Sequence, residues 1–225
     1  MVEPEASGKA HWERFATQDP EFYIASQQDT WAQDEFYADG ARIVERVGSW
    51  IDALERHALA VEIGCGLGRI SVHLAQRFER VLATDITSSM IEQARTRGLP
   101  DNITLETNDG RLPCADGTAD LVFSYNVMQH IPEPAEIGTY LVEVARVLQP
   151  AGRGVIQFDA AARPFWRDLA MKLPDPLLPR THRRFIRRYP LAPARLEGLI
   201  ADADLRVLDV HSPGSTEHFV LLARR

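Results

Sequence analysis

The amino-acid sequence predicts an α/β fold in which a seven-stranded, mostly parallel sheet carries helices on both faces, with a helical lid before the first strand and an insertion after the fifth. The main observation is a regular alternation of short apolar runs with segments of helical periodicity. In addition, the first apolar run ends in a glycine-rich loop, and the next runs end in acidic or amide side chains. Ligands of such sheets bind beyond the carboxyl ends of the strands. The loops after residues 64, 85, 107 and 125 are therefore expected to meet at one site.

The expected elements follow one another with short connections. The first helix is expected over 34–56, because its apolar residues fall on one stripe. Strands are expected over 59–64, 80–85, 102–107, 119–125, 153–159, 204–211 and 216–223. Helices are expected between them over 69–77, 89–97, 134–147 and 193–202. The last two strands are joined through residues 211–216 and are expected to pair as an antiparallel hairpin.

Composition and charge describe an ordinary globular protein. The chain has 225 residues, 45% hydrophobic and 25% charged, which suits a single domain with one substantial core. The net charge of −7 argues against a nucleic-acid binder that needs a broad basic surface. The first residues lack the pattern of a signal peptide, and no apolar run approaches the roughly 18 residues of a membrane span. Cys65 and Cys114 give neither a disulfide framework nor a metal-ligand spacing. We expect a cytoplasmic protein with no metal and no nucleic-acid or membrane partner, either a monomer or a homodimer.

The densest motif lies at residues 61–69, where Glu62 is followed by Gly64, Gly66 and Gly68 at alternating positions. Such glycines let a strand turn abruptly toward a helix, and they leave the backbone open to a ligand. The spacing E-x-G-x-G-x-G differs from the G-x-G-x-x-G of nicotinamide-binding loops. An acidic residue before the first glycine suits a ligand with positive charge or with hydroxyl and amine donors, and it would repel a pyrophosphate. A nicotinamide oxidoreductase is therefore disfavoured.

Further motifs follow in order along the chain. Asp85 ends the second apolar run, and the residues Asn108-Asp109-Gly110 follow the third. The sequence LPCADGTADLVFS occupies 112–124, NVMQHI occupies 126–131 and VLQPAGR occupies 147–153. Together with the glycine loop, these motifs resemble those of the class I S-adenosylmethionine-dependent methyltransferases that act on small molecules. The departures are small, because only Gln149 and Ala151 replace the lysine and the first glycine of the last motif.

The resemblance implies a Rossmann-like methyltransferase fold with S-adenosylmethionine as cofactor and S-adenosylhomocysteine as product. The implied cofactor-binding positions are Glu62, Gly64, Cys65, Gly66, Gly68, Asp85, Ile86, Asn108, Asp109, Gly110, Asn126 and Val127. In this family the acid at Asp85 takes both ribose hydroxyls, and the acid at Asp109 accepts from the adenine amine. Simpler roles stay open for both residues, because Asp85 can cap the next helix and Asp109 can serve the turn at Gly110.

The same resemblance divides the single domain into four parts. Residues 1–57 form a helical lid, 58–159 the cofactor-binding core, 160–192 a substrate cap and 193–225 a C-terminal helix and hairpin. The lid is rich in aromatic residues, which belong either to the core or to the wall of a ligand site. Tyr23 and Trp31 are the candidates for contact with an acceptor.

The implied reaction moves a methyl group to an oxygen or nitrogen atom of a small-molecule acceptor by in-line displacement. A sulfonium already activates its methyl group, so the protein mainly aligns the acceptor and excludes water. His130 is the first candidate for a base if the acceptor is a hydroxyl or an ammonium. Residues 124–126 lack the Asn-Pro-Pro-Tyr or Asp-Pro-Pro-Tyr of the nucleic-acid adenine and protein glutamine methyltransferases. The alternatives are a noncatalytic cofactor-binding or scaffold protein and methylation of a macromolecule.

The insertion carries an unusual set of arginines, at positions 180, 183, 184, 187 and 188. If 180–188 is helical, they share one face, opposite Phe185, Ile186 and Tyr189. One interpretation is a solvated helix face, and the other is recognition of an anionic acceptor, carrier or partner by guanidinium groups. The candidate acceptor-binding residues are Tyr23, Trp31, Tyr125, Arg183, Arg184 and Arg187.

Overall fold

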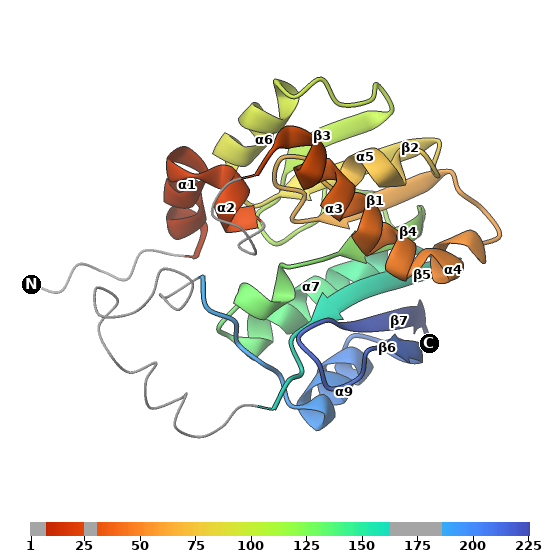
Figure 1. Cartoon of the computed structure of the whole chain (residues 1–225). Helices are drawn as coiled ribbons and strands as arrows, with labels where there is room; N and C mark the ends of the chain where they lie inside the picture. Colours follow the sequence, from red (N-terminus) through yellow and green to blue (C-terminus); the bar gives the residue numbers. More distant parts are fainter. Residues whose placement is uncertain (1–7, 25–30, 163–185) are drawn as a thin grey trace, which may run out of the picture.

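The computed structural model describes residues 8–24, 31–162 and 186–225, which contain a seven-stranded sheet in the order β3-β2-β1-β4-β5-β7-β6 (Figure 1). The strands are β1 (Leu59–Ile63), β2 (Arg80–Asp85), β3 (Ile103–Thr107), β4 (Ala119–Ser124), β5 (Leu148–Phe158), β6 (Leu205–His211) and β7 (His218–Arg224). The strands β1 to β5 are parallel, whereas β7 runs antiparallel between β5 and β6. The predicted sheet and its C-terminal hairpin are confirmed.

Helices cover both faces of this sheet (Figure 1). One face carries α3 (Gln33–Arg46), α4 (Gly48–Asp52), α5 (Ser71–Leu74) and α6 (Ser88–Arg95), and the other carries α7 (Pro134–Val147) and α9 (Pro193–Asp202). Ile43, Leu74 and Ile91 pack in the apolar core of the first face. Leu141 and Leu196 pack in the core of the second. Both cores bury the apolar stripes that the sequence periodicity indicated. Burial of this apolar surface is the main driving force for packing the helices on the sheet.

Two N-terminal helices, α1 (Gly8–Gln18) and α2 (Pro20–Ile24), lie beside α6 near the carboxyl ends of β1 and β2 (Figure 1). The carboxylate of Glu13 accepts hydrogen bonds from Ser88 N, Ser88 Oγ and Ser89 N at 2.7, 3.0 and 3.2 Å. Glu13 thus caps the first turn of α6, where backbone N–H groups lack helical partners. These helices, which we call the lid, form part of the predicted N-terminal helical segment.

Two further contacts hold the lid against α6. Gln93 Nε2 donates to the carbonyl oxygen of Ala16 at 2.8 Å. Arg97 pairs with Glu21 at 2.9 Å. The lid is therefore fastened at both ends of α6, the helix that follows Asp85 and its loop.

The predicted single helix over 34–56 is wrong, because the chain breaks it at Val47. Val47 has φ −115° and ψ 16°, outside the helical region, and Gly48 follows as a weak helix former. The helix predicted over 69–77 is regular only over Ser71–Leu74. After Leu74 the amides of Arg77 and Phe78 both donate to its carbonyl oxygen at 2.9 Å, which turns the chain into β2.

The fifth strand begins at Leu148 and not near residue 153 as predicted. The residue Val147 ends α7, and Leu148 immediately pairs with Ala119. Regular pairing resumes only at Leu121 with Arg153, so the residues between form a bulge. Residues 149–152, part of the VLQPAGR motif, therefore lie within one irregular strand.

The described end of the insertion, residues 186–192, packs against both the lid and the sheet. Ile186 is buried in a cluster with Phe15, Phe22 and Tyr23 of the lid. The amide of Tyr189 donates to Gln129 O at 2.7 Å. Residues 186–188 form a turn and irregular chain, and the rest of the predicted arginine face lies outside the described residues. Within those residues, no helix is long and apolar enough to cross a membrane.

Candidate cofactor and acceptor site

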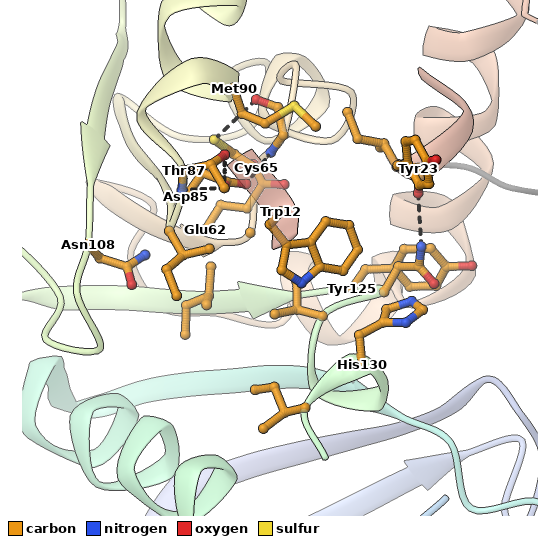
Figure 2. A pocket seen from close by; sticks show the side chains of 18 of the residues that line it. Trp12, Tyr23, Glu62, Cys65, Asp85, Thr87, Met90, Asn108, Tyr125 and His130 are labelled. Carbon is orange, nitrogen blue, oxygen red and sulfur yellow. Dashed lines mark hydrogen bonds between the residues drawn. The ribbon is translucent and has the colours of Figure 1, made fainter. Parts of the chain in front are cut away.

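A cavity lies where the loops after β1, β2, β3 and β4 meet beneath the lid (Figure 2). β1 pairs with β2 on one side and with β4 on the other, so this is the switch point at which α/β sheets bind ligands. The predicted residues that line it are Tyr23, Glu62, Gly64, Cys65, Gly66, Asp85, Ile86, Asn108, Tyr125, Asn126, Val127 and His130. The convergence of these loops agrees with the sequence-based expectation.

Several predicted residues are not among those lining the cavity. Gly68 packs toward Leu99, and Trp31 packs edge-on against Phe36 at 6.0 Å between ring centroids. Asp109 is exposed, and its Oδ1 accepts from Arg111 N at 3.4 Å, which is turn geometry. Gly110 follows in the same turn.

Of the predicted arginines, Arg187 is also outside the lining. It donates from Nε to the hydroxyl of Tyr189 at 3.1 Å, and its guanidinium lies over that ring. Arg183 and Arg184 lie outside the described residues. The cofactor and acceptor roles assigned from the sequence stay predictions for all of these residues.

The glycine loop connects β1 to α5 through left-handed backbone. The φ angles of Gly64 and Gly66 are +76° and +52°, a region that favours glycine. The amides of Gly64 and Cys65 donate to Thr84 O at 2.8 and 2.9 Å. These bonds hold the loop against the end of β2, which places bare backbone along the floor of the cavity.

Asp85 joins the glycine loop to the loop that precedes α6. Its Oδ2 accepts from Gly66 N at 3.0 Å, and its Oδ1 accepts from Thr87 N and Thr87 Oγ1 at 3.0 and 2.9 Å. Burial raises the pKa of Asp85, while the amides of Thr87 and Gly66 act in the opposite direction. A carboxylate has about four lone-pair sites, and these three bonds leave about one of them, on Oδ2, for a hydroxyl of a ligand.

Glu62 is a second buried acid, at the end of β1. It is 3% exposed and accepts a hydrogen bond from Ser71 Oγ at 2.5 Å. Burial raises the pKa of Glu62 to about 7, and the positive charge of Arg69 counteracts part of that effect. Two buried acids on neighbouring strands line this end of the cavity, and a ligand with a positive charge or several donors would favour their charged forms.

Arg69 lines the cavity although the sequence reasoning did not select it. It is 2% exposed, pairs with Asp39 of α3, and lies over the rings of Phe36 and Tyr125. Arg69 directly follows the third glycine of the motif, and this position could have indicated a place near the cavity. Arg69 ties the glycine loop to α3.

The β3 side of the cavity is formed by Asn108 and Tyr140. Asn108 is buried, and its Nδ2 donates to Thr84 Oγ1 at 3.1 Å. The hydroxyl of Tyr140 donates to Asn108 Oδ1 at 3.3 Å. Tyr140 belongs to α7 and was not predicted as a site residue, because an aromatic residue on the apolar side of a helix is usually part of the core.

The opposite end of the cavity is formed by His130 together with aromatic residues of the lid (Figure 2). The ring of Trp12 lies edge-on to that of His130, with 5.6 Å between centroids. Tyr23 stacks on Phe15 at 4.2 Å, so its ring belongs both to the small lid core and to the cavity wall. Among the described residues, no group of three or more His, Cys, Asp or Glu side chains could hold a metal ion.

The family model described as "Methyltransferase domain" matches residues 61–156. An uncharacterized 37.1 kDa protein in transposon TN4556 of Streptomyces fradiae is 34% identical over 156 residues, 66% of this chain and 42% of that protein. The dimethylglycine N-methyltransferase of Parasynechococcus marenigrum is 32% identical over 148 residues, 63% of this chain and 50% of that protein. The chain thus spans at most about half the length of these two relatives.

The fold has close counterparts among solved structures. The magnesium protoporphyrin IX methyltransferase of Synechocystis PCC 6803 with bound S-adenosylhomocysteine superposes with a TM-score of 0.69 at 19% identity, covering 97% of this chain and all of that one. The chain has the Rossmann-like fold of the class I S-adenosylmethionine-dependent methyltransferases, and its residues 61–156 match the model of the methyltransferase domain.

Proposed function

We propose that the protein binds S-adenosylmethionine in this cavity and transfers its methyl group to an oxygen or nitrogen atom of a small-molecule acceptor. The observation that carries the proposal is Asp85, a buried carboxylate at the end of β2 that is held by Gly66 and Thr87. One ribose hydroxyl would donate to the free site on Oδ2, and its neighbour would donate to Oδ1 in place of the Thr87 hydroxyl. The bare backbone of the glycine loop leaves room for the rest of the cofactor.

The other residues take roles that follow from their chemistry. Glu62 would hold the cofactor's amino group, with Asn126 and Val127 at the end nearer the methyl group. Asn108 would border the adenine, and the sequence adds Asp109 and Gly110 to that part. When bound, the sulfonium supplies an already activated methyl group. The protein's own part is to position the acceptor in line and to exclude water, which the lid residues Trp12 and Tyr23 promote.

A small molecule is the favoured acceptor because the lid covers the end of the cavity that His130 and Trp12 form. Two of the similar proteins are named for small acceptors, dimethylglycine and magnesium protoporphyrin IX. The alternatives are a macromolecular acceptor and a noncatalytic cofactor-binding protein. Turnover of a broad panel of small acceptors separates these possibilities, because a noncatalytic protein binds the cofactor and methylates none of them.

Cofactor choice provides the first test. We expect S-adenosylmethionine and S-adenosylhomocysteine to bind with micromolar Kd, about −7 to −8 kcal/mol, and NAD to bind far more weakly. The reason is that the acidic end of the cavity favours an amino group and disfavours a pyrophosphate. Titration calorimetry measures both. Equal or tighter binding of NAD would contradict the proposal.

The lid contact of Glu13 provides a second test. We expect Glu13→Ala to speed release of S-adenosylhomocysteine by roughly 5-fold, because loss of a helix cap costs about 1 kcal/mol and loosens the lid from α6. Stopped-flow displacement measures the release rate. Thr17→Ala is the control, since it changes an exposed residue of the same lid whose hydroxyl donates to Arg14 O within α1. An equal effect of both variants would show that the cap does not hold the lid.

A further inference from the structure

His130 is held by a chain of side-chain amides that begins at β5. Gln157 Nε2 donates to the carbonyl oxygens of Phe158 and Thr216 at 2.9 and 2.7 Å, and its Oε1 accepts from Asn126 N at 2.9 Å. Two carbonyl acceptors on one side and an amide donor on the other fix the orientation of this side chain. Gln157 is 1% exposed, so water does not compete for these bonds.

The orientation of Gln157 determines that of Gln129, which is also 1% exposed. Gln129 Oε1 lies 3.0 Å from Gln157 Nε2 and shares one of its two N–H groups with a carbonyl oxygen. The Nε2 of Gln129 therefore points the other way, where it donates to Asn126 Oδ1 and lies 3.2 Å from His130 Nε2. An amide NH₂ is a donor only, so the Nε2 of His130 must be the acceptor in this contact.

This contact determines which nitrogen of His130 carries the proton. Burial lowers the pKa of His130 to about 4, and the positive charge of Arg188 acts in the same direction, so the ring is neutral at neutral pH. Hydrogen bonding of the ring to the backbone of Arg187 and Ile186 raises that pKa, with a smaller effect than burial. A neutral imidazole has one donor and one acceptor. With Nε2 accepting from Gln129, the proton resides on Nδ1.

Neither the backbone of Arg187 and Ile186 nor any other described group lies in regular hydrogen-bond geometry with Nδ1, which is buried. His130 lines the cavity and is 8% exposed (Figure 2). A buried donor without a partner costs free energy, and native proteins rarely leave one unpaired. An oxygen atom of a ligand is a natural partner for this N–H.

We propose that His130 binds a carboxylate of the acceptor through Nδ1–H, and that Gln129 is a positioning residue that fixes this tautomer. The inference rests on the methyltransferase function proposed above. Arg188 is half-buried, acts on the same ring, and forms no ion pair with an acid among the described residues. A positive charge beside a neutral donor favours an anionic oxygen. Trp12 and Tyr23 form an aromatic wall for the body of such an acceptor.

The same geometry bears on the reaction. Because the lone pair of His130 Nε2 is engaged and Nδ1 already carries a proton, His130 is arranged as a donor and not as the base that the sequence suggested. A carboxylate needs no base. Its oxygen lone pair forms the new O–C bond while the C–S bond breaks and leaves its electron pair on sulfur. The products are a methyl ester and a neutral thioether, and no proton is released.

The tautomer is tested directly in the protein without ligand by ¹⁵N NMR of the imidazole nitrogens, with His130→Asn identifying the resonances. We expect a protonated Nδ1, an unprotonated Nε2 and no titration between pH 8 and 5.5. Gln129→Glu should reverse the pattern, because a carboxylate beside Nε2 accepts a proton there. An Nε2-protonated wild-type ring, or one that titrates near pH 6.5, overturns the proposal.

Ligand recognition is tested with benzoate and, as its neutral analogue, benzyl alcohol, added to protein saturated with S-adenosylhomocysteine. Benzoate should shift the Nδ1 resonance and benzyl alcohol should not. We expect His130→Asn, whose amide imitates Nδ1–H, to keep benzoate affinity within about 3-fold, and His130→Gln to lose roughly 10-fold or more. The control His211→Asn lies on β6, away from the cavity. Equal binding of the two probes, or equal loss in both His130 variants, contradicts the proposal.

Failure of this inference and failure of the proposed function give different results. If calorimetry finds no binding of S-adenosylmethionine or S-adenosylhomocysteine, the methyltransferase function fails whatever the tautomer is. If both bind while His130 is protonated on Nε2, the function stands and the carboxylate site is wrong. Thermal unfolding of each variant in the absence of ligand shows whether it is folded before binding is compared.

Discussion

Asp85→Ala is expected to weaken S-adenosylmethionine binding by about 2–3 kcal/mol, roughly 30- to 150-fold in Kd, because charge-assisted acceptors for two ribose hydroxyls are lost from a buried site. The substitution also removes the acceptor of the Gly66 and Thr87 amides, so the two loops loosen. Titration calorimetry of the variant against the wild type measures the change.

The fold should survive this substitution. The two unpaired amides cost about 1–3 kcal/mol each, but removal of a buried charge whose pKa is raised by burial returns part of this free energy. Thr87→Val separates the roles, since it removes only the hydroxyl bond to Oδ1 and should leave binding within about 3-fold. Asp101→Ala in an exposed turn is the neutral control. Normal cofactor affinity together with a large drop in Tm would show that Asp85 serves only as a link between loops.

The sheet and the glycine loop could be predicted because their signals are local. The apolar strand 59–63 and the glycines of its loop are adjacent in the sequence. The polar residues that end the other strands are likewise adjacent to the apolar runs that predict those strands. The loops converge because the strands are parallel, so the position of Asp85 beside Gly66 follows from topology. Family resemblance added the chemical identity of the ligand.

The residues that sequence reasoning missed depend on contacts between distant segments. Gln157 and Gln129 are separated by 28 positions; Gln157 lies in no motif, and Gln129 lies in the NVMQHI motif without a role that the sequence indicates. Trp12 belongs to α1, whose aromatic side chains also pack in a small core with Ile186. The aromatic composition of this segment therefore could not distinguish a core residue from a residue of the cavity wall. The break in the helix at Val47 depends on packing and on Gly48. Apolar periodicity continues across this position, so it does not predict the break.

Gly64→Ala is expected to destabilise the protein by about 2–5 kcal/mol and to abolish cofactor binding. The φ of +76° disfavours a side chain by about 1–2 kcal/mol, and the new Cβ would lie 2.1 Å from Val127 Cγ2, an overlap that costs about 1–3 kcal/mol more. Chemical denaturation measures the first effect and calorimetry the second. Gly117→Ala is the matched control, because its φ of +65° is similar and nothing lies within 4 Å of the added Cβ.

The control isolates the conformational part, so Gly117→Ala should lose about 1–2 kcal/mol and leave cofactor affinity unchanged. The double variant Gly64→Ala with Val127→Ala tests the steric part, because it removes the methyl group that the new Cβ meets while the strain in φ remains. We expect it to recover about 1–3 kcal/mol of the loss, which a double-mutant cycle reports as a coupling between the two positions. A cycle without coupling would mean that the loop moves away from Val127 at little cost. The close contact between the glycine loop and the loop after β4 would then be unnecessary for the shape of the cofactor site.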